Sequence, residues 1–165
     1  MEEIMLIDDI LASAISYNKQ DVKRVNHLLK VFSFAHHIGV MEKCDVETQE
    51  IIDISAILHD IGIHEAERKH NSNAGNWQEI EGPPVANELL KNFNLDDVIK
   101  DRILFLIGHH HQYTLIEGMD FQILVEADFL VNIFEDGMDA HSIKSVKEKI
   151  FKTKSGVNLL EKLYL

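Results

Sequence analysis

Apolar residues recur three and four positions apart along most of the chain, and no stretch shows the alternation of a half-buried strand. This periodicity predicts an all-α protein. The expected helices span residues 2–17, 19–40, 45–61, 83–93, 94–111, 120–135, 139–151 and a short stretch from 155. Asp45, Asp139 and Ser155 are placed to cap their helices, and Gly62 and Gly137 are placed to end theirs.

Residues 64–80 are polar and contain glycine, which predicts a long loop. Loops of this length are uncommon in compact proteins and are often functional or disordered. The adjacent Pro83 and Pro84 suit the first turn of the helix that follows. Trp77 lies in the expected loop, and its ring is expected to anchor packing, with stacking on a ligand ring as the alternative.

The charge balance limits the molecules that the protein can bind, because 28 acidic residues outnumber 16 basic ones and the net charge is -12. Duplex nucleic acid is therefore not an expected partner, whereas a small phosphorylated molecule held through a cation is.

No apolar run approaches the roughly 20 residues that span a bilayer, so no membrane contact is expected. The acidic start is unlike a signal peptide, and the single cysteine, Cys44, fits a cytoplasmic setting.

Three acidic or histidine positions lie in apolar surroundings. His59 and Asp60 stand inside Ile57–Gly62, and Asp128 shares a helix face with Leu124 and Val131. Burying an ionised carboxylate without a partner is costly, and a bound metal removes that cost. The alternatives are a hydrogen-bonded helix end for His59-Asp60, and backbone donors or an arginine for Asp128.

The remaining histidines divide into inward and outward positions. His27 heads an apolar stripe, as a metal ligand or a satisfied core histidine would. His36 and His37 are expected at the surface. His110 faces inward from the end of its helix, with His109 and His111 beside it. These three could reach a second metal or a phosphate, or could lie together at the surface without a function.

In this order, His27, His59-Asp60 and Asp128 resemble the HD-domain superfamily of phosphohydrolases. The resemblance extends to other blocks: Leu58–Gly62, which reads Leu-His-Asp-Ile-Gly, Gly82–Leu90 with Ala86, His109-His110 and Ala127-Asp128. It covers about residues 20–137. It implies an HD-type bundle of about six to eight helices, forming one domain over 1–165 with a core at 20–137 and a helical extension at 138–165.

The branch of the superfamily is not assigned by these residues. Many members have histidine where Gln78 stands, which leads us to expect a mononuclear site. Cyclic-dinucleotide phosphodiesterases have lysine at the position of Ile63 and a Gly-Tyr-Pro signature that is absent after His111. Alarmone hydrolases have Glu-Asp where Ile63 and His64 stand.

The resemblance implies a metal-dependent phosphohydrolase that cleaves a phosphomonoester or phosphodiester of a small, nucleotide-like substrate. His27, His59, Asp60 and Asp128 would bind Fe, Mn, Co, Ni, Zn or Mg, and the cation would activate a water molecule.

Other residues are assigned around that centre. Asp60, Glu65 and His64 are the candidate catalytic groups, and His109, His110 and Gln78 are candidates for contact with a cofactor or phosphate. The alternatives are a metal-bound nucleotide sensor without turnover and an iron oxygenase. A homo-oligomer of the protein is also possible.

Overall fold

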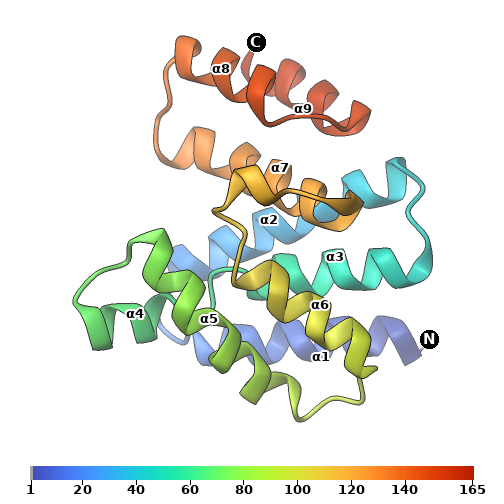
Figure 1. Ribbon diagram of the computed structural model, residues 1–165, viewed down its shortest axis with the longest axis vertical. Helices are drawn as coiled ribbons and strands as arrows, with labels where there is room; N and C mark the ends of the chain where they lie inside the picture. The colour runs from blue at the N-terminus through green and yellow to red at the C-terminus, as the bar shows by residue number, and fades with distance from the viewer. Residues whose placement is uncertain (1) are drawn as a thin grey trace.

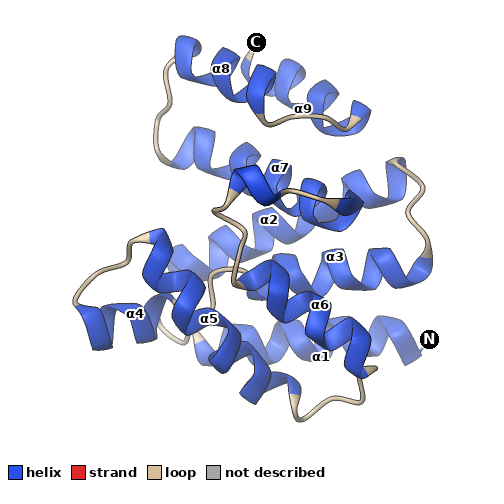
Figure 2. Ribbon diagram, in the orientation of Figure 1, coloured by secondary structure: helices blue, strands red, loops and turns tan. Residues whose placement is uncertain are grey.

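The chain folds into helices throughout, as its periodicity predicts. The structure is a computed structural model that describes residues 2–165 and the side chains of residues 5–165. The elements are α1 (Glu2–Tyr17), α2 (Val22–Met41), α3 (Val46–Leu58), α4 (Ile63–His70), α5 (Gly75–Leu90), α6 (Asp97–Ile107), the 3-10 turn η1 (Tyr113–Leu115), α7 (Gly118–Glu135), α8 (Ala140–Lys149) and α9 (Lys154–Tyr164). Figure 2 shows no strand in this part of the chain.

Helix α3 lies at the centre of the bundle. It packs against α1, α2, α6 and α7, and every residue from Ile51 to Leu58 is buried. Helices α2 and α7 also pack closely against each other. The α4–α5 pair lies to one side, and the α8–α9 pair covers α7 at the end of the molecule (Figure 1). None of the described helices is long and apolar enough to cross a bilayer.

Two of the three predicted caps are confirmed. The side chain of Asp45 accepts a hydrogen bond from the Thr48 amide at 2.8 Å, and that of Asp139 accepts one from the Ser142 amide at 2.7 Å. The prediction for Ser155 is wrong. Thr153 caps α9 instead, because its backbone is extended there and its hydroxyl oxygen accepts from the amide N–H of Gly156.

The predicted loop over residues 64–80 is also wrong. Most of it is helical, in α4 and the first turns of α5, and the connection is only residues 71–74. Ile63 and Ala66 anchor the polar helix α4 to the interior, and Glu65 pairs with Arg68 and Lys69 one turn away. Pro83 and Pro84 lie inside α5 and do not start it.

The turn between α3 and α4 is pressed directly onto α5. A Cβ atom on Gly62 would lie 2.4 Å from the backbone nitrogen of Gly82 and 2.7 Å from the carbonyl oxygen of Gln78. Only glycine allows this approach of the two backbones. The contact fixes the turn that carries His59 and Asp60.

A buried carboxylate ties the C-terminal helices to α7. Glu126 is fully buried and accepts hydrogen bonds from the Lys152 and Thr153 amides at 2.6 and 2.9 Å, and from the Thr153 hydroxyl. Beside it, Glu42 at the end of α2 accepts from the Ser155 amide at 2.7 Å. The start of α9 is therefore held by two acidic side chains from different helices.

Candidate metal centre

Four predicted ligands come together from three helices. His27 projects from α2, His59 and Asp60 follow the last turn of α3, and Asp128 projects from the middle of α7. His27, His59 and Asp128 are buried, and the side chain of Asp60 is 24% exposed. The antiparallel packing of α2 on α3 brings the start of one helix beside the end of the other (Figure 1).

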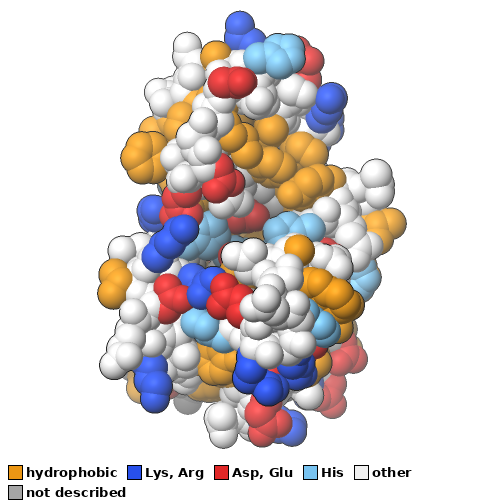
Figure 3. Space-filling model, turned by 90° about the vertical axis from the view of Figure 1, so that its left-hand side faces the viewer, with side chains coloured by type: hydrophobic (Ala, Val, Ile, Leu, Met, Phe, Trp, Pro, Cys, Tyr) orange, Lys and Arg blue, Asp and Glu red, His pale blue; other side chains and the backbone are white. Residues whose placement is uncertain are grey.

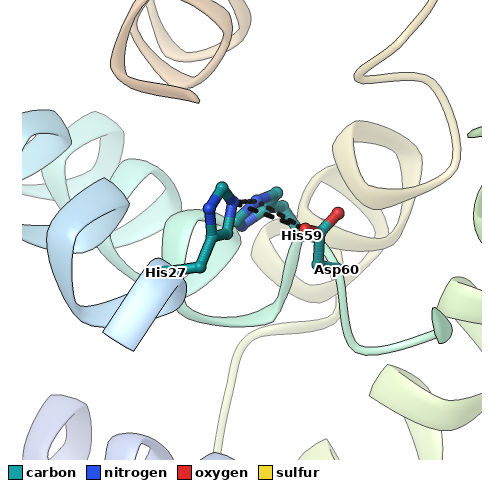
Figure 4. A group of neighbouring side chains, drawn as sticks. All are labelled: His27, His59 and Asp60. Atoms are coloured by element: carbon teal, nitrogen blue, oxygen red, sulfur yellow. Dashed lines mark hydrogen bonds and ion pairs between the residues drawn. The ribbon is translucent and has the colours of Figure 1, made fainter. Parts of the chain in front are cut away.

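The distances between their polar atoms are short. His27 Nε2 lies 3.4 Å from Asp60 Oδ2 and 3.3 Å from Asp128 Oδ1. His59 Nε2 lies 3.4 Å from Asp60 Oδ2 and 3.6 Å from Asp128 Oδ1. Figure 4 shows His27, His59 and Asp60 directed at one another. The four side chains thus surround one point, and their role as ligands stays a prediction.

The imidazoles are oriented by their second nitrogen. Nδ1 of His27 pairs with Glu135 Oε2 at 2.8 Å, and Nδ1 of His59 pairs with the Ala56 carbonyl oxygen at 2.8 Å. Because these oxygen atoms can only accept, each Nδ1 carries the proton and each Nε2 presents a lone pair in the neutral ring. Metal-binding histidines are usually held in this way. The donor set therefore fits a metal ion.

His110 shows the same orientation. Its Nδ1 pairs with the carbonyl oxygen of Ile107 at 3.0 Å, and its side chain is 1% exposed. Its Nε2 has no hydrogen-bond partner among the described residues and lies 3.5 Å from Asp60 Oδ1. A buried ring nitrogen without a partner is costly, and a cation would satisfy it.

The charges of the centre depend on one another. Burial lowers the pKa of His59, but the carboxylates of Asp60 and Asp128 outweigh it and raise that pKa well above its usual value. Burial raises the pKa of Asp60, but His59 and His110 hold it well below its usual value. The carboxylates are thus kept ionised, as metal ligands must be.

A second group shares Asp60 with the first. Asp60, His110 and His111 each offer a ligand atom, and these atoms lie within 4.8 Å of one another. Gln78 borders this group, since its Oε1 lies 3.4 Å from His111 Nε2 while its amide donates to the carbonyl oxygen of Asn73. Asp60 therefore faces one group with Oδ2 and the other with Oδ1.

The structure places His111 in this group where the sequence favoured His109. Helix α6 ends at Ile107, so the three histidines lie in a turn and do not continue the helix as expected. His109 turns back, pairing with the carbonyl oxygen of Phe105 at 2.7 Å and stacking on its ring. Gly108, at the C-terminal cap of α6, is the residue in the sequence that signals this helix end.

The two remaining catalytic candidates lie outside both groups. His64 Nε2 pairs with Asn18 Oδ1 at 3.0 Å, and Glu65 is held by Arg68 at 2.7 Å. Glu65 therefore faces cations and not the buried imidazoles. Trp77 packs as an anchor, with its ring stacked on His70 at 3.8 Å between centroids.

Several residues that support the candidate metal centre were not predicted from the sequence. Glu135 orients His27, and Asn132 donates to Asp128 Oδ1 at 2.9 Å. Burial, together with the charges of Asp128 and Glu79, raises the pKa of Tyr113 to about 12. Asn132 could have been found, because it follows Asp128 by one helical turn.

One face of the molecule has a depression (Figure 3). Acidic and histidine side chains gather in a depression across the middle of the face in Figure 3, with hydrophobic side chains on its upper wall. Tyr113 and Phe129, whose ring centroids are 5.2 Å apart, flank the candidate ligands His111 and Asp128 along the chain.

The fold is that of the HD superfamily of hydrolases. The crystal structure, at 1.45 Å resolution, of a predicted HD superfamily hydrolase from an uncultured Thermotogales bacterium is similar to this chain with a TM-score of 0.67 and 25% sequence identity. The similarity covers 95% of this chain and 84% of that one. No family model and no curated protein sequence matches the chain. The structural similarity confirms the resemblance and the all-α fold inferred from the sequence.

Proposed function

We propose that the protein is a metal-dependent phosphohydrolase that cleaves a phosphate ester of a small, nucleotide-like molecule. The observation that carries this proposal is the orientation of three imidazoles. His27, His59 and His110 each have Nδ1 engaged and Nε2 directed toward Asp60. A site built only for stability would not need three imidazole Nε2 atoms converging on one carboxylate.

The donor chemistry supports a divalent transition metal. Imidazole nitrogen and carboxylate oxygen suit Fe, Mn, Co, Ni or Zn. Mg²⁺, which is a chemically harder cation, is the alternative. His27, His59, Asp60 and Asp128 would hold the ion. When bound, such an ion polarises a phosphoryl oxygen and lowers the pKa of water from 15.7 toward about 7.

The protein's own groups can assist the reaction. Asp60 is partly exposed, so its carboxylate can orient a water molecule. His110 Nε2 can donate to a phosphate oxygen when it is protonated. Burial and neighbouring His110 lower the pKa of His111 to about 4, so His111 stays neutral and acts as a lone-pair donor.

A metal-reconstitution assay tests the proposal. The protein is stripped with a chelator, reloaded with each of the six metals, and assayed with a panel of nucleoside monophosphates and cyclic nucleotides. The products measured are free phosphate from the monophosphates and nucleoside monophosphate from the cyclic nucleotides. We expect hydrolysis of at least one substrate with at least one metal, and its loss in Asp60→Asn. Asp97→Asn is the matched control, because this side chain is 89% exposed on α6.

The same assay separates the alternatives. Binding of a nucleotide by the metal-loaded protein without hydrolysis of any substrate would favour the sensor and contradict the phosphohydrolase. Oxygen consumption with the iron form, again without hydrolysis, would favour an oxygenase. Hydrolysis by Asp60→Asn equal to that of the unchanged protein would contradict the assignment of this centre.

A further inference from the structure

A cavity lies away from the candidate metal centre. Its volume is about 750 Å³, within the range of small-molecule sites. It opens between α1, α2 and α3. The lining residues are Ile7, Asp8, Phe32, Ser33, His36, Val40, Cys44, Val46, Gln49, Glu50 and Asp53.

The cavity and the metal centre occupy opposite ends of the α2–α3 pair. His27 lies near the start of α2 and His59 follows the end of α3, whereas Val40 lies near the end of α2 and Val46 starts α3. The turn between these helices, which carries Cys44, lies at the right of Figure 1, and α4 lies at the left. The cavity is therefore a separate site.

One face of each helix builds the cavity. Its α3 residues are 46, 49, 50 and 53, and its α2 residues include 32, 36 and 40, which are helical spacings that place side chains on one side. Phe32, Val40 and Val46 form apolar walls, and the two valines are 54% and 66% exposed. Apolar side chains left open to water favour an apolar occupant.

The polar part of the cavity centres on Asp53. This residue is 5% exposed, and its carboxylate accepts from His36 Nδ1 at 2.9 Å and from Gln49 Nε2 at 2.8 Å. Each carboxylate oxygen has a second lone pair that these bonds do not use. Asp53 can therefore accept a further hydrogen bond from a ligand in the cavity.

The charges of the residues that line the cavity decide which ligand charge it favours. Asp8, Glu50 and Asp53 are acidic, and the described residues that line the cavity include no lysine or arginine. A phosphorylated molecule would be repelled, so the cavity is unsuited to the substrate of the metal centre. A cationic group is attracted, and more strongly where Asp53 is shielded from water.

We propose that this cavity binds a small organic cation, whose apolar body lies against Phe32, Val40 and Val46 and whose positively charged nitrogen donates to Asp53. The proposal is independent of the function proposed for the metal centre. Under this proposal the protein binds two ligands of opposite charge at the two ends of the α2–α3 pair.

Three probes of the same shape and different charge test the proposal. Benzamidine is cationic, benzamide neutral and benzoate anionic, so the ring contributes equally and only the charge changes. Binding to the full chain is measured at pH 8 by amide chemical-shift titration, with and without metal. We expect benzamidine to bind about tenfold or more tightly than benzoate, with shifts in α2 and α3 around the cavity.

Two substitutions and a control complete the test. Asp53→Asn should remove the preference for benzamidine over benzamide, whereas Asp97→Asn, which makes the same change in net charge, should retain it. Val46→Lys places a cation on an exposed wall and should weaken benzamidine binding about tenfold, even if Asp53→Asn impairs folding. Equal binding of benzamidine and benzoate, equal effects of Asp53→Asn and Asp97→Asn, or shifts confined to the metal centre would overturn the proposal.

Discussion

His27 Nε2 lies 3.2 Å from His59 Nε2, and both rings have their other nitrogen engaged by an oxygen acceptor. Two neutral rings would therefore direct lone pairs at each other, which is unfavourable unless a proton or a metal ion lies between them. A metal ion bound between the two Nε2 atoms would therefore take the place of that proton.

Replacing a ligand should abolish metal retention. We expect His59→Ala and Asp128→Ala each to lose the bound metal, because each removes one of the donors around the shared point. His36→Ala should keep it, since His36 pairs with Asp53 in the cavity between α1, α2 and α3. Inductively coupled plasma analysis of the purified variants measures this. Equal metal loss from His36→Ala would mean that the wrong histidine of α2 has been assigned.

Removing the partner of His27 should weaken the site without destroying it. Glu135 accepts from His27 Nδ1 and also pairs with Lys30. Glu135→Ala should lower metal affinity about 10- to 100-fold, the usual effect of losing such a partner. Lys30→Ala is the control, because it leaves the bond to His27 in place. Competition with a chromogenic chelator gives the affinities, and unchanged affinity in Glu135→Ala would show that His27 needs no orienting partner.

The number of metal ions should be near one per chain. The second group offers Asp60, His110 and His111, but beside His111 stands the neutral amide of Gln78. Gln78→His should raise the stoichiometry toward two by adding an imidazole there. Metal analysis with quantitative amino-acid analysis decides the matter. A value near two in the unchanged protein, falling to one when His110 and His111 are both replaced, would contradict the mononuclear prediction.

The attachment of α9 should depend on pH. The side-chain and backbone groups of Ser155 hold the pKa of Glu42 below its usual value. A lowered pKa contributes stability that is present above the unfolded-state pKa, about 4.3, and is lost as pH falls through the folded-state value. Glu42→Gln should therefore be less stable than the unchanged protein near pH 6, and the difference should shrink toward about pH 3. Urea unfolding at both pH values measures it, and a difference independent of pH would reject the explanation.

The approach of Gly62 to Gly82 should be intolerant of a side chain. Gly62→Ala places a methyl group against backbone atoms, so we expect a loss of about 1–3 kcal/mol in unfolding free energy, as for overpacking, and weaker metal binding. Gly137→Ala is the comparison, because its positive φ of 62° strains the backbone but no atom lies within 4 Å of the new methyl group. Equal metal affinity in both variants would show that this contact does not position Asp60.

The sequence predicted the helices whose apolar faces are long and clear, such as α1, α2 and α7, together with the residues that meet at the metal centre. Buried polar residues inside apolar runs carry that information, because they need a partner. The polar helix α4 was missed, since only Ile63 and Ala66 are buried and its ion pairs do not alter apolar periodicity. The choice between His109 and His111 was also missed, because it depends on where α6 ends, and helix ends are the least certain part of such a prediction.

The attachment of α9 to Glu126 bears on the order in which the protein can mature during synthesis. Glu126 lies two residues before Asp128 on α7. Gln122 of the same helix donates to it, but its other hydrogen bonds come from the Lys152 amide and from the amide and hydroxyl of Thr153. When Asp128 has left the ribosome, Glu126 on the same helix still lacks the donors of residues 152 and 153. Stable capture of metal is therefore expected to wait for residues near 153, although every ligand lies earlier in the chain.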